Sequence, residues 1–552
     1  MNYKAIYNEW LQNPNLDKEI KNELIKMNEE TIKQSFYGTL SFGTAGMRGI
    51  LGAGTNRLNI YTIRKATLGY SNYLIKHIQN SKEKGVAIGH DNRFNSRKFC
   101  LDCASLLSSM GIKVYIFDDL RPTPEISFAI RELKAAGGII ITASHNPKEY
   151  NGYKVYDENG CQLIDYKTDL LIEEINKIND IISFKFKENK SLITVLKENF
   201  DKVYYDEIKK LSLQQPDKKD FIVVYSPQHG TALNGIRTIL TDLGYNLHLV
   251  ESQCSYDPQF SNTLSPNPED ERAYVELIKL AKQVNADLVI TTDPDGDRIG
   301  IGCKSGDGYT LLTGNQTGAL ILDYLAINNK LNYDSLVISS IVTTSLIEKI
   351  ANKHGAFFKQ TLTGFKYIGD TITRYENEKE FAFAVEESYG CALSNIVRDK
   401  DSLQAALIIS EMSCYYKNNG YTLLDRLDKI YETYGYHYDK VVSYNLDSLN
   451  GSNQINEIMT YLRELSLKNL AGYQITKIED YLKDIPGFVK SNVLKFIFDD
   501  GTFIAIRPSG TEPKYKIYYN IVDKNKEKSL TKLEELQLSL TKIINQKISN
   551  LK

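Results

Sequence analysis

The chain has 552 residues, of which 42% are hydrophobic and 25% are charged, and its formal net charge at pH 7 is −2. This composition excludes a disordered or fibrous protein, and the length predicts three or four folded domains. Acidic and basic residues are interspersed along the sequence, which argues against a nucleic-acid or membrane-surface partner.

The N-terminal region and the cysteines both favour a cytoplasmic protein. The first ten residues lack the apolar core of a signal peptide, and no later segment approaches the ~20 apolar residues of a membrane span. The chain has 7 cysteines, an odd number, which indicates reduced thiols. Cys100 and Cys103 form a C-x-x-C pair, but they share one face of a predicted helix with apolar neighbours, so we expect them to be buried core residues.

The predicted elements alternate between strands and helices along most of the chain. An amphipathic helix is expected over 16–35, and the first predicted strands cover 85–89, 111–117 and 137–141. Two similar sets of alternating strands and helices follow, with predicted strands at 221–225, 244–250, 286–292, 335–340 and 381–385. The last segment differs, because strand-like runs at 494–498, 502–507 and 515–521 precede a helix over 530–548. This order predicts three related mixed α/β domains (1–205, 206–312 and 313–430) and a C-terminal α+β domain (431–552) around a central cleft.

A serine follows the apolar run that ends at Ile141. The string Thr-Ala-Ser-His-Asn-Pro at 142–147 puts Ser144 at the exit of a buried strand, where open α/β sheets bind their ligands. No Gly-x-Ser-x-Gly elbow is present, so an acyl-transfer triad is not indicated. Phosphorylation of Ser144 is the better interpretation.

Three aspartates follow the apolar run at 288–290. Asp293, Asp295 and Asp297 alternate with Pro294 and Gly296, so a tight turn can direct three carboxylates at one hard cation, for which Mg²⁺ is the expected ion. A calcium-binding EF-hand loop is excluded, because its sixth and twelfth positions would be arginine and lysine here instead of glycine and glutamate.

A third polar string, Arg-Pro-Ser-Gly-Thr-Glu-Pro at 507–513, follows a predicted strand. Arg507, Ser509, Gly510 and Thr511 offer a guanidinium fork, two hydroxyls and unhindered backbone N–H groups, which together suit a phosphate. A hydroxyl nucleophile, a metal site and an anion site are the components of phosphoryl transfer.

The three strings, in this order and at these separations, resemble the α-D-phosphohexomutase superfamily, and in particular the larger bacterial branch of its phosphoglucomutase/phosphomannomutase family. The resemblance runs from near the N-terminus to the last hundred residues. It implies that Ser144 is a phosphoserine, and that its oxygen and the three aspartates hold one Mg²⁺. It also implies that the 507–511 loop binds the phosphate that is not transferred.

The same resemblance assigns further site residues. The implied proton handlers or charge clamps are Arg48 and Lys154, with His145 as a neighbour of the nucleophile. The implied substrate-binding residues also include Arg298 of the metal loop, Glu386 and Ser388 of a sugar-binding loop, and Thr363, Gly364 and Lys366 of a loop that senses which end of the sugar is presented.

The implied activity is the interconversion of glucose 1-phosphate and glucose 6-phosphate through a hexose 1,6-bisphosphate, which also serves as activator. Mannose and pentose phosphates remain alternative substrates. A non-catalytic sugar-phosphate sensor would be expected to lack Ser144 or one of the aspartates, and all are present. A phosphatase remains a third alternative, since a phosphoenzyme that admits water hydrolyses. The sequence leaves the oligomeric state open.

Overall fold

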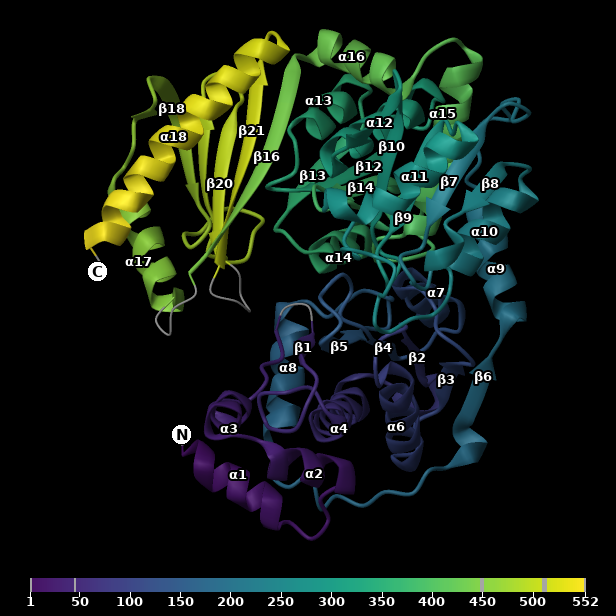
Figure 1. Ribbon diagram of the computed structural model, residues 1–552, viewed down its shortest axis with the longest axis vertical. Coiled ribbons are helices and arrows are strands. Elements are labelled where there is room, and N and C mark those ends of the chain that lie inside the picture. Colours follow the sequence, from purple (N-terminus) through teal and green to yellow (C-terminus); the bar gives the residue numbers. More distant parts are fainter. Residues whose placement is uncertain (1, 44–45, 447–450, 509–513, 551–552) are drawn as a thin grey trace. The chain divides into compact units, whose positions relative to one another are not determined.

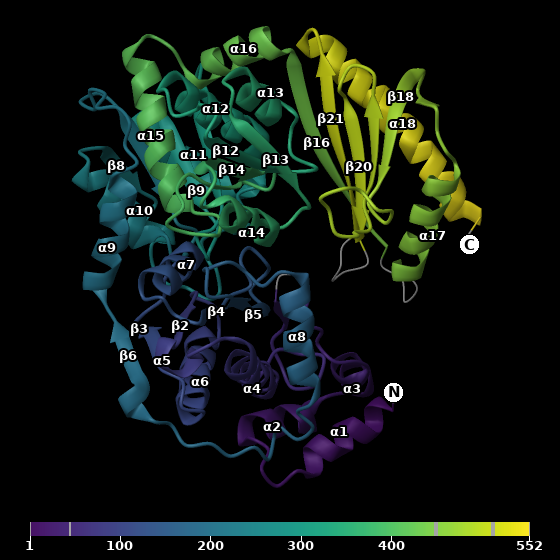
Figure 2. The same ribbon diagram turned by 180° about the vertical axis from the view of Figure 1, so that it is seen from behind.

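The computed structural model describes residues 2–43, 46–446, 451–508 and 514–550. It contains four β-sheets (Figures 1 and 2). The chain forms two compact units: the first comprises residues 1–314, 364–384 and 388–422, and the second comprises 315–363, 385–387 and 423–552. Within the described ranges, no helix has the length and apolar character needed to cross a membrane.

Three helices precede the first sheet, namely α1 (Tyr3–Gln12), α2 (Lys18–Lys26) and α3 (Glu29–Phe36). The prediction of one continuous helix over 16–35 was therefore wrong. Asn28 has an extended backbone, and its side chain accepts a hydrogen bond of 2.8 Å from the backbone N–H of Thr31. An asparagine in this position caps a new helix, so the apolar stripe continues across a break in the backbone.

The first sheet has six strands in the order β1-β5-β4-β2-β3-β6. The strands are β1 (Met47–Ile50), β2 (Val86–His90), β3 (Val114–Phe117), β4 (Gly137–Ile141), β5 (Tyr150–Tyr156) and β6 (Ile193–Leu196). The helices are α4 (Ile60–His77), α5 (Ser81–Lys84), α6 (Ser96–Ser109), α7 (Thr123–Glu132), α8 (Asp165–Asn176) and α9 (Glu198–Lys209). Strands β4, β2, β3 and β6 pair in parallel, and β4 is buried along its whole length, as its apolar sequence predicts. Cys100 and Cys103 are buried on α6 with free thiols, so their prediction as core residues is confirmed.

The second sheet repeats this plan with strand order β11-β10-β9-β7-β8. Its strands are β7 (Ile222–Ser226), β8 (Asn246–Leu249), β9 (Leu288–Thr292), β10 (Ile299–Ser305) and β11 (Gly308–Leu312), and its helices are α10 (Leu233–Asp242) and α11 (Val275–Val284). Parallel pairing joins β9, β7 and β8, whereas β10 and β11 are antiparallel additions. Both sheets thus place polar loops at the carboxyl ends of buried parallel strands.

The third sheet has the order β13-β12-β14-β15. Its strands are β12 (Ser335–Ser340), β13 (Phe357–Thr361), β14 (Glu380–Glu386) and β15 (Gly390–Ala392). The helices of this region are α12 (Gly314–Ile327), α13 (Leu346–Lys353), α14 (Phe365–Tyr375) and α15 (Ser402–Asn418).

The fourth sheet is antiparallel throughout, with the order β16-β21-β20-β19-β18-β17. Its strands are β16 (Tyr436–Asn445), β17 (Asn469–Leu470), β18 (Tyr473–Asp480), β19 (Leu494–Phe498), β20 (Phe503–Pro508) and β21 (Lys514–Asp523), and the nearby helices are α16 (Leu423–Tyr434), α17 (Gly451–Glu464) and α18 (Lys526–Asn550). The long helix α18 lies across one face of this sheet (Figure 1), where its leucines share a core with the strands. The α+β character predicted for the C-terminal region is confirmed.

Candidate active site

Ser144 lies three residues beyond the end of β4, and its side chain is almost fully buried. Its backbone is left-handed, with φ of 51°, and its N–H donates a 2.9 Å hydrogen bond to Oγ1 of Thr142. Its hydroxyl donates a 2.6 Å hydrogen bond to Oδ2 of Asp293 and lies 3.2 Å from Nδ1 of His145. The predicted nucleophile and the predicted acidic loop are therefore in contact.

The acidic loop connects β9 to β10 and carries three buried carboxylates. Oxygens of Asp293, Asp295 and Asp297 lie within 4.8 Å of one another. Gly296 has φ of 68°, a conformation that glycine adopts without steric cost and that turns the loop sharply. One oxygen each of Asp295 and Asp297 is buried without a hydrogen-bond partner in the described part of the chain. Because buried carboxylate oxygens are costly when unpaired, this set fits a hard divalent cation such as Mg²⁺.

Four cationic side chains are found at the acidic loop. Nζ of Lys154, on β5, lies 2.8 Å from Oδ2 of Asp295 and 3.7 Å from Oδ2 of Asp297. Nζ of Lys400 lies 3.1 Å from the same oxygen of Asp297. These contacts partly offset the repulsion between the carboxylates.

The other two cations are arginines. Nη1 of Arg48, on β1, donates a 3.1 Å hydrogen bond to Oδ1 of Asn146 in the serine loop. Arg298 pairs with Glu269 and has its Nε 3.8 Å from Oδ1 of Asp297. Burial lowers the pKa of Arg48, and the carboxylates of the acidic loop oppose this effect.

The pKa values of Asp293 and Asp295 are shifted in opposite directions because their partners differ. Burial and the neighbouring charges of Asp295 and Asp297 raise the pKa of Asp293 well above its usual value. Burial acts in the same sense on Asp295, but the positive charge of Lys154 and hydrogen bonds from Lys154 and Asp293 bring the pKa of Asp295 below its usual value. The pKa values of these two neighbouring carboxyls are therefore displaced to opposite sides of the usual value.

Three of the predicted substrate-binding residues, Gly364, Lys366 and Ser388, belong to the first compact unit. Gly364 precedes α14, Lys366 is buried in its first turn, and Ser388 follows β14 and is half-buried. Nζ of Lys366 donates a 2.5 Å hydrogen bond to Oδ1 of Asp165, so its ammonium is already engaged by a carboxylate. This residue would have to exchange that partner in order to bind a substrate oxygen.

The remaining predicted substrate residues with described positions belong to the second unit. Thr363 has a buried Oγ1 without a hydrogen-bond partner among the described residues, and Glu386 is buried at the end of β14. Arg507 lies on β20 directly opposite Lys516 on β21. Like charges opposite each other destabilise a sheet pair, so this arrangement favours an anion as a third partner. Ser509, Gly510 and Thr511 lie outside the described residues.

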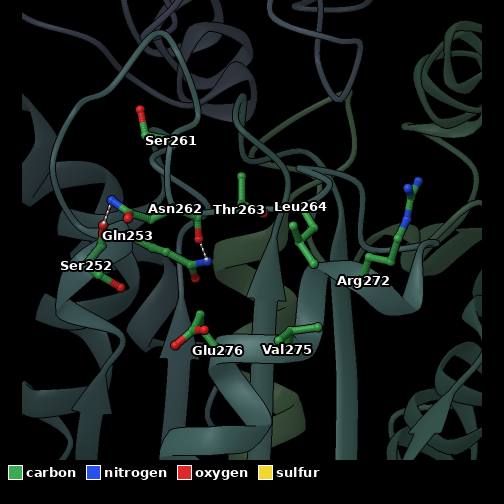
Figure 3. Close-up of a pocket in the computed structure, with 9 residues that line it drawn as sticks. All are labelled: Ser252, Gln253, Ser261, Asn262, Thr263, Leu264, Arg272, Val275 and Glu276. Carbon is green, nitrogen blue, oxygen red and sulfur yellow. Dashed lines mark hydrogen bonds between the residues drawn. The ribbon is translucent and has the colours of Figure 1, made fainter.

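A surface pocket on the second α/β domain contains none of these residues. It has a volume of about 420 Å³, and it is lined by Ser252, Gln253, Ser261, Asn262, Thr263, Leu264, Arg272, Val275 and Glu276 (Figure 3). Gln253 donates a 2.6 Å hydrogen bond to the carbonyl of Asn262, which closes one wall of the pocket. The acidic group that could hold a metal ion, Asp293, Asp295 and Asp297, is not among its lining residues.

Two cationic residues next to the site were not predicted from the sequence. Lys400 belongs to the polar run that precedes α15, and Arg93 follows β2, the strand adjacent to β4. The available signal for Arg93 was its place just beyond a buried parallel strand, where site residues collect. For Lys400 the sequence offers only a charged loop, and its proximity to Asp297 depends on the tertiary fold.

Comparison with known proteins identifies the family of this chain. Four models of the phosphoglucomutase/phosphomannomutase family match: the alpha/beta/alpha domains I, II and III over residues 39–181, 202–306 and 313–434, and the C-terminal domain over 465–534. The chain is 38% identical to a phosphoglucomutase of Staphylococcus aureus strain MSSA476, over 94% of this chain and 95% of that relative. It is 40% identical to the phosphoglucomutase of the bovine strain RF122, over 89% and 91% of the two chains.

Solved structures share the fold at lower sequence identity. The Paramecium phosphoprotein parafusin, a phosphoglucomutase in an open form, matches with a TM-score of 0.69 and 21% identity over 94% of this chain and 95% of that chain. A phosphoglucomutase/phosphomannomutase family protein of Burkholderia thailandensis matches with a TM-score of 0.68 and 17% identity over 90% and 96%. With all four domain models matched in order and curated relatives aligned over nearly the whole length, this chain belongs to the phosphoglucomutase/phosphomannomutase family of the α-D-phosphohexomutases.

Proposed function

We propose that this chain is an intramolecular phosphotransferase that interconverts glucose 1-phosphate and glucose 6-phosphate through a phosphorylated Ser144 and a glucose 1,6-bisphosphate. The observation that carries the proposal is the contact between the Ser144 hydroxyl and the buried acidic loop. A phosphoryl group on this hydroxyl would need cationic charge, and the loop brings Lys154, Lys400 and the arginines to the same place.

In the proposed forward reaction the free 6-hydroxyl of glucose 1-phosphate attacks the phosphorus of phospho-Ser144. The bond from phosphorus to Oγ of Ser144 breaks, Oγ takes up the proton that the 6-hydroxyl loses, and the sugar becomes a bisphosphate. After the bisphosphate has turned around, Oγ of Ser144 attacks the phosphorus at the 1-position and the bond from that phosphorus to the sugar O1 breaks. The proton that leaves Oγ ends on O1, which gives glucose 6-phosphate. Oδ2 of Asp293 at 2.6 Å and Nδ1 of His145 at 3.2 Å are within reach of that proton.

We assign one Mg²⁺ to Ser144 and to Asp293, Asp295 and Asp297. When bound, it would supply Lewis-acid stabilisation of phosphoryl charge. Lys154 and Arg48 are proposed to hold the charge and the orientation of the serine loop, because each contacts this loop or the acidic loop. Arg298 is proposed to bind substrate from the edge of the acidic loop.

The substrate would be held by the remaining predicted residues. Arg507, Ser509, Gly510 and Thr511 are proposed to bind the phosphate that is not being transferred, and Lys516 adds charge opposite Arg507. Glu386 and Ser388 are proposed to bind vicinal sugar hydroxyls, and Thr363, Gly364 and Lys366 to sense which end of the sugar is presented.

The test is a mutase assay with Mg²⁺ and a trace of glucose 1,6-bisphosphate, comparing glucose, mannose and ribose 1-phosphates. The proposal expects a clear preference for glucose and a requirement for the bisphosphate. Ser144→Ala should lose at least about 1,000-fold in kcat while keeping its melting temperature, since the nucleophile is removed without a core cavity. Preference for another sugar would reassign the substrate, and normal turnover by Ser144→Ala would refute the phosphoserine mechanism.

A further inference from the structure

Arg93, in the loop after β2, is buried and directs its guanidinium at the loop that carries Ser144. Nη1 donates hydrogen bonds to the carbonyl oxygens of Pro147 at 2.8 Å and Tyr150 at 3.0 Å. Nη2 donates to the carbonyl oxygens of Ser144 at 2.5 Å and Asn146 at 2.6 Å. One side chain therefore holds four carbonyls of the segment 144–150, which follows β4 and ends at the first residue of β5.

The guanidinium of Arg93 also has neighbours that hold it in place, namely Asp91 and Phe260. Its Nε lies 3.1 Å from Oδ2 of Asp91, and Oδ1 of Asp91 accepts hydrogen bonds from the backbone N–H of Arg93 at 3.0 Å and from Oγ of Ser96 at 2.7 Å. The ring of Phe260, from the second α/β domain, has its centroid 5.2 Å from Cζ of Arg93. The four N–H groups on Nη1 and Nη2 are thus engaged by four carbonyls, and Nε lies beside a carboxylate.

The segment that Arg93 holds includes a residue in an unfavourable conformation. The φ of 51° at Ser144 lies in the left-handed region, which is unfavourable for a non-glycine residue, and such a conformation persists only where its surroundings impose it. Arg93 donates a hydrogen bond to the carbonyl oxygen of this residue, and Oγ1 of Thr142 accepts a hydrogen bond from its N–H. Lysine could not replace the arginine, because an ammonium has three donors and no planar fork.

From this geometry we infer that Arg93 is a positioning residue for the proposed phosphoryl transfer: it holds the segment 144–150 so that Oγ of Ser144 stays directed at the acidic loop. The inference rests on the proposed function for its kinetic part only, since the hold on the loop is a property of the fold. Arg93 acts through the backbone of the nucleophile, so its loss should reduce the rate of transfer more than the binding of substrate.

The test compares Arg93→Lys with a matched control, Arg64→Lys. Arg64 also pairs with a carboxylate, that of Asp102, and stacks on an aromatic ring, that of Phe186, but it donates to no carbonyl of the segment 144–150. Arg93→Lys should lower kcat by about 100-fold with KM within about threefold, because a displacement of about 1 Å at a reacting group costs this much. Arg64→Lys should leave both parameters near wild type. A kcat within threefold of wild type for Arg93→Lys, or a rise in KM alone, would overturn the inference.

Hydrogen exchange of residues 144–150 tests the hold on the loop without any substrate. It should be at least about tenfold faster in Arg93→Lys than in wild type or in Arg64→Lys, because four hydrogen bonds that restrain this segment are weakened. Unchanged exchange would overturn the inference even if the wild-type enzyme proved inactive on sugar phosphates. Wild-type turnover of sugar phosphates, measured in the mutase assay, tests the proposed function separately.

Asp91→Asn provides a second variant in case Arg93→Lys folds poorly. It keeps the guanidinium and the shape of its neighbour but removes the charge that faces Nε. An intermediate loss of kcat, accompanied by intermediate exchange in 144–150, is the expected result. Wild-type values for both would contradict the role of Arg93.

Discussion

Oγ of Ser144 lies 2.6 Å from Oδ2 of Asp293, although 149 positions separate the two residues in the chain. The serine follows a strand of the first sheet and the aspartate follows a strand of the second. Each residue occupies the carboxyl end of a buried parallel strand, so the contact brings together the sites that two separate sheets would offer to a ligand. The chemistry therefore depends on both domains being folded against each other within the first compact unit.

The acidic loop should respond directly to divalent metal. A ligand that binds only the folded state stabilises it by about 2.7 kcal/mol at 100 times its Kd, so Mg²⁺ should raise the melting temperature of the wild type and chelation should reverse the rise. Asp297→Asn should lose most of the Mg²⁺-dependent shift. Asp206→Asn, a partly exposed aspartate that pairs with lysines on its own helix, should keep it. Equal shifts in both variants would remove Asp297 from the metal site.

Gly230 is required where the loop after β7 packs against the acidic loop. A Cβ at this position would lie 2.6 Å from Cα of Pro294 and 2.7 Å from the carbonyl oxygen of Pro227. Gly230→Ala should therefore displace the acidic loop, lower stability by about 1–3 kcal/mol and reduce kcat. Gly308→Ala is the control, because a Cβ there would meet only the carbonyl of Ser305, at 3.9 Å. If both variants behaved alike in thermal unfolding and turnover, the close approach would not matter for the site.

Arg507 should contribute to substrate binding. Arg507→Ala removes a cation that lies opposite Lys516 on the neighbouring strand. It should raise KM by about tenfold or more, because hydrogen bonds to a charged phosphate are worth about 1.5–3 kcal/mol. The effect on kcat should be smaller. Arg374→Ala, an exposed arginine paired within α14, should leave steady-state kinetics unchanged. An unaltered KM in Arg507→Ala would exclude the arginine from the phosphate site.

Asp439 should make stability depend on pH. It lies on β16 and accepts a hydrogen bond from Asn520 on β21, whose amide also donates to Oγ1 of Thr344 at 3.0 Å. Burial raises the pKa of Asp439 to about 7. The folded state thus keeps a proton that the unfolded chain releases near pH 4, so this residue's contribution to stability is lost as pH rises from about 4 to about 7.

Asp439→Asn removes this titration and keeps an oxygen that can accept from Asn520. The variant should therefore gain stability relative to wild type, by about 2 kcal/mol, between pH 5 and pH 8 in denaturant titrations. Burial lowers the pKa of nearby His437 to about 4, an effect of opposite sign that both proteins share and that cancels in the comparison. Asp484→Asn, at an exposed position, should follow the wild-type profile. Parallel curves for wild type and Asp439→Asn would contradict the prediction.

The sequence predicted those elements whose signal is local. The buried strands β4, β9 and β12 stand out because each contains a run of three consecutive aliphatic residues, as is typical of central strands of a parallel sheet. The antiparallel strands β5 and β10 were not predicted, because they mix polar and apolar residues and follow site loops. The break at Asn28 was missed since the apolar stripe of 16–35 fits one helix or two, and only the asparagine cap decides between them.

The site residues also fall into two groups: those that a local sequence pattern predicts and those whose role depends on the tertiary fold. Ser144 and the aspartates were predicted because their strings follow strong strands, and the structure brings them together. Arg93 and Lys400 were missed because a charged residue in a loop gains its role from partners distant in the sequence, such as Asp297 for Lys400. The partnership of Lys366 with Asp165 has the same origin: no local pattern links two residues 201 positions apart.

The position of β16 in the last sheet has a consequence for synthesis of the chain. This edge strand pairs along its whole length with β21, the final strand, so it leaves the ribosome well before its partner exists. At about 5–20 residues per second, the delay is on the order of several seconds. During that interval the serine and acidic loops are already complete, whereas β16 offers unpaired backbone groups to any other strand. A nascent chain that stalls before residue 514 would therefore be an aggregation hazard rather than a partly active enzyme.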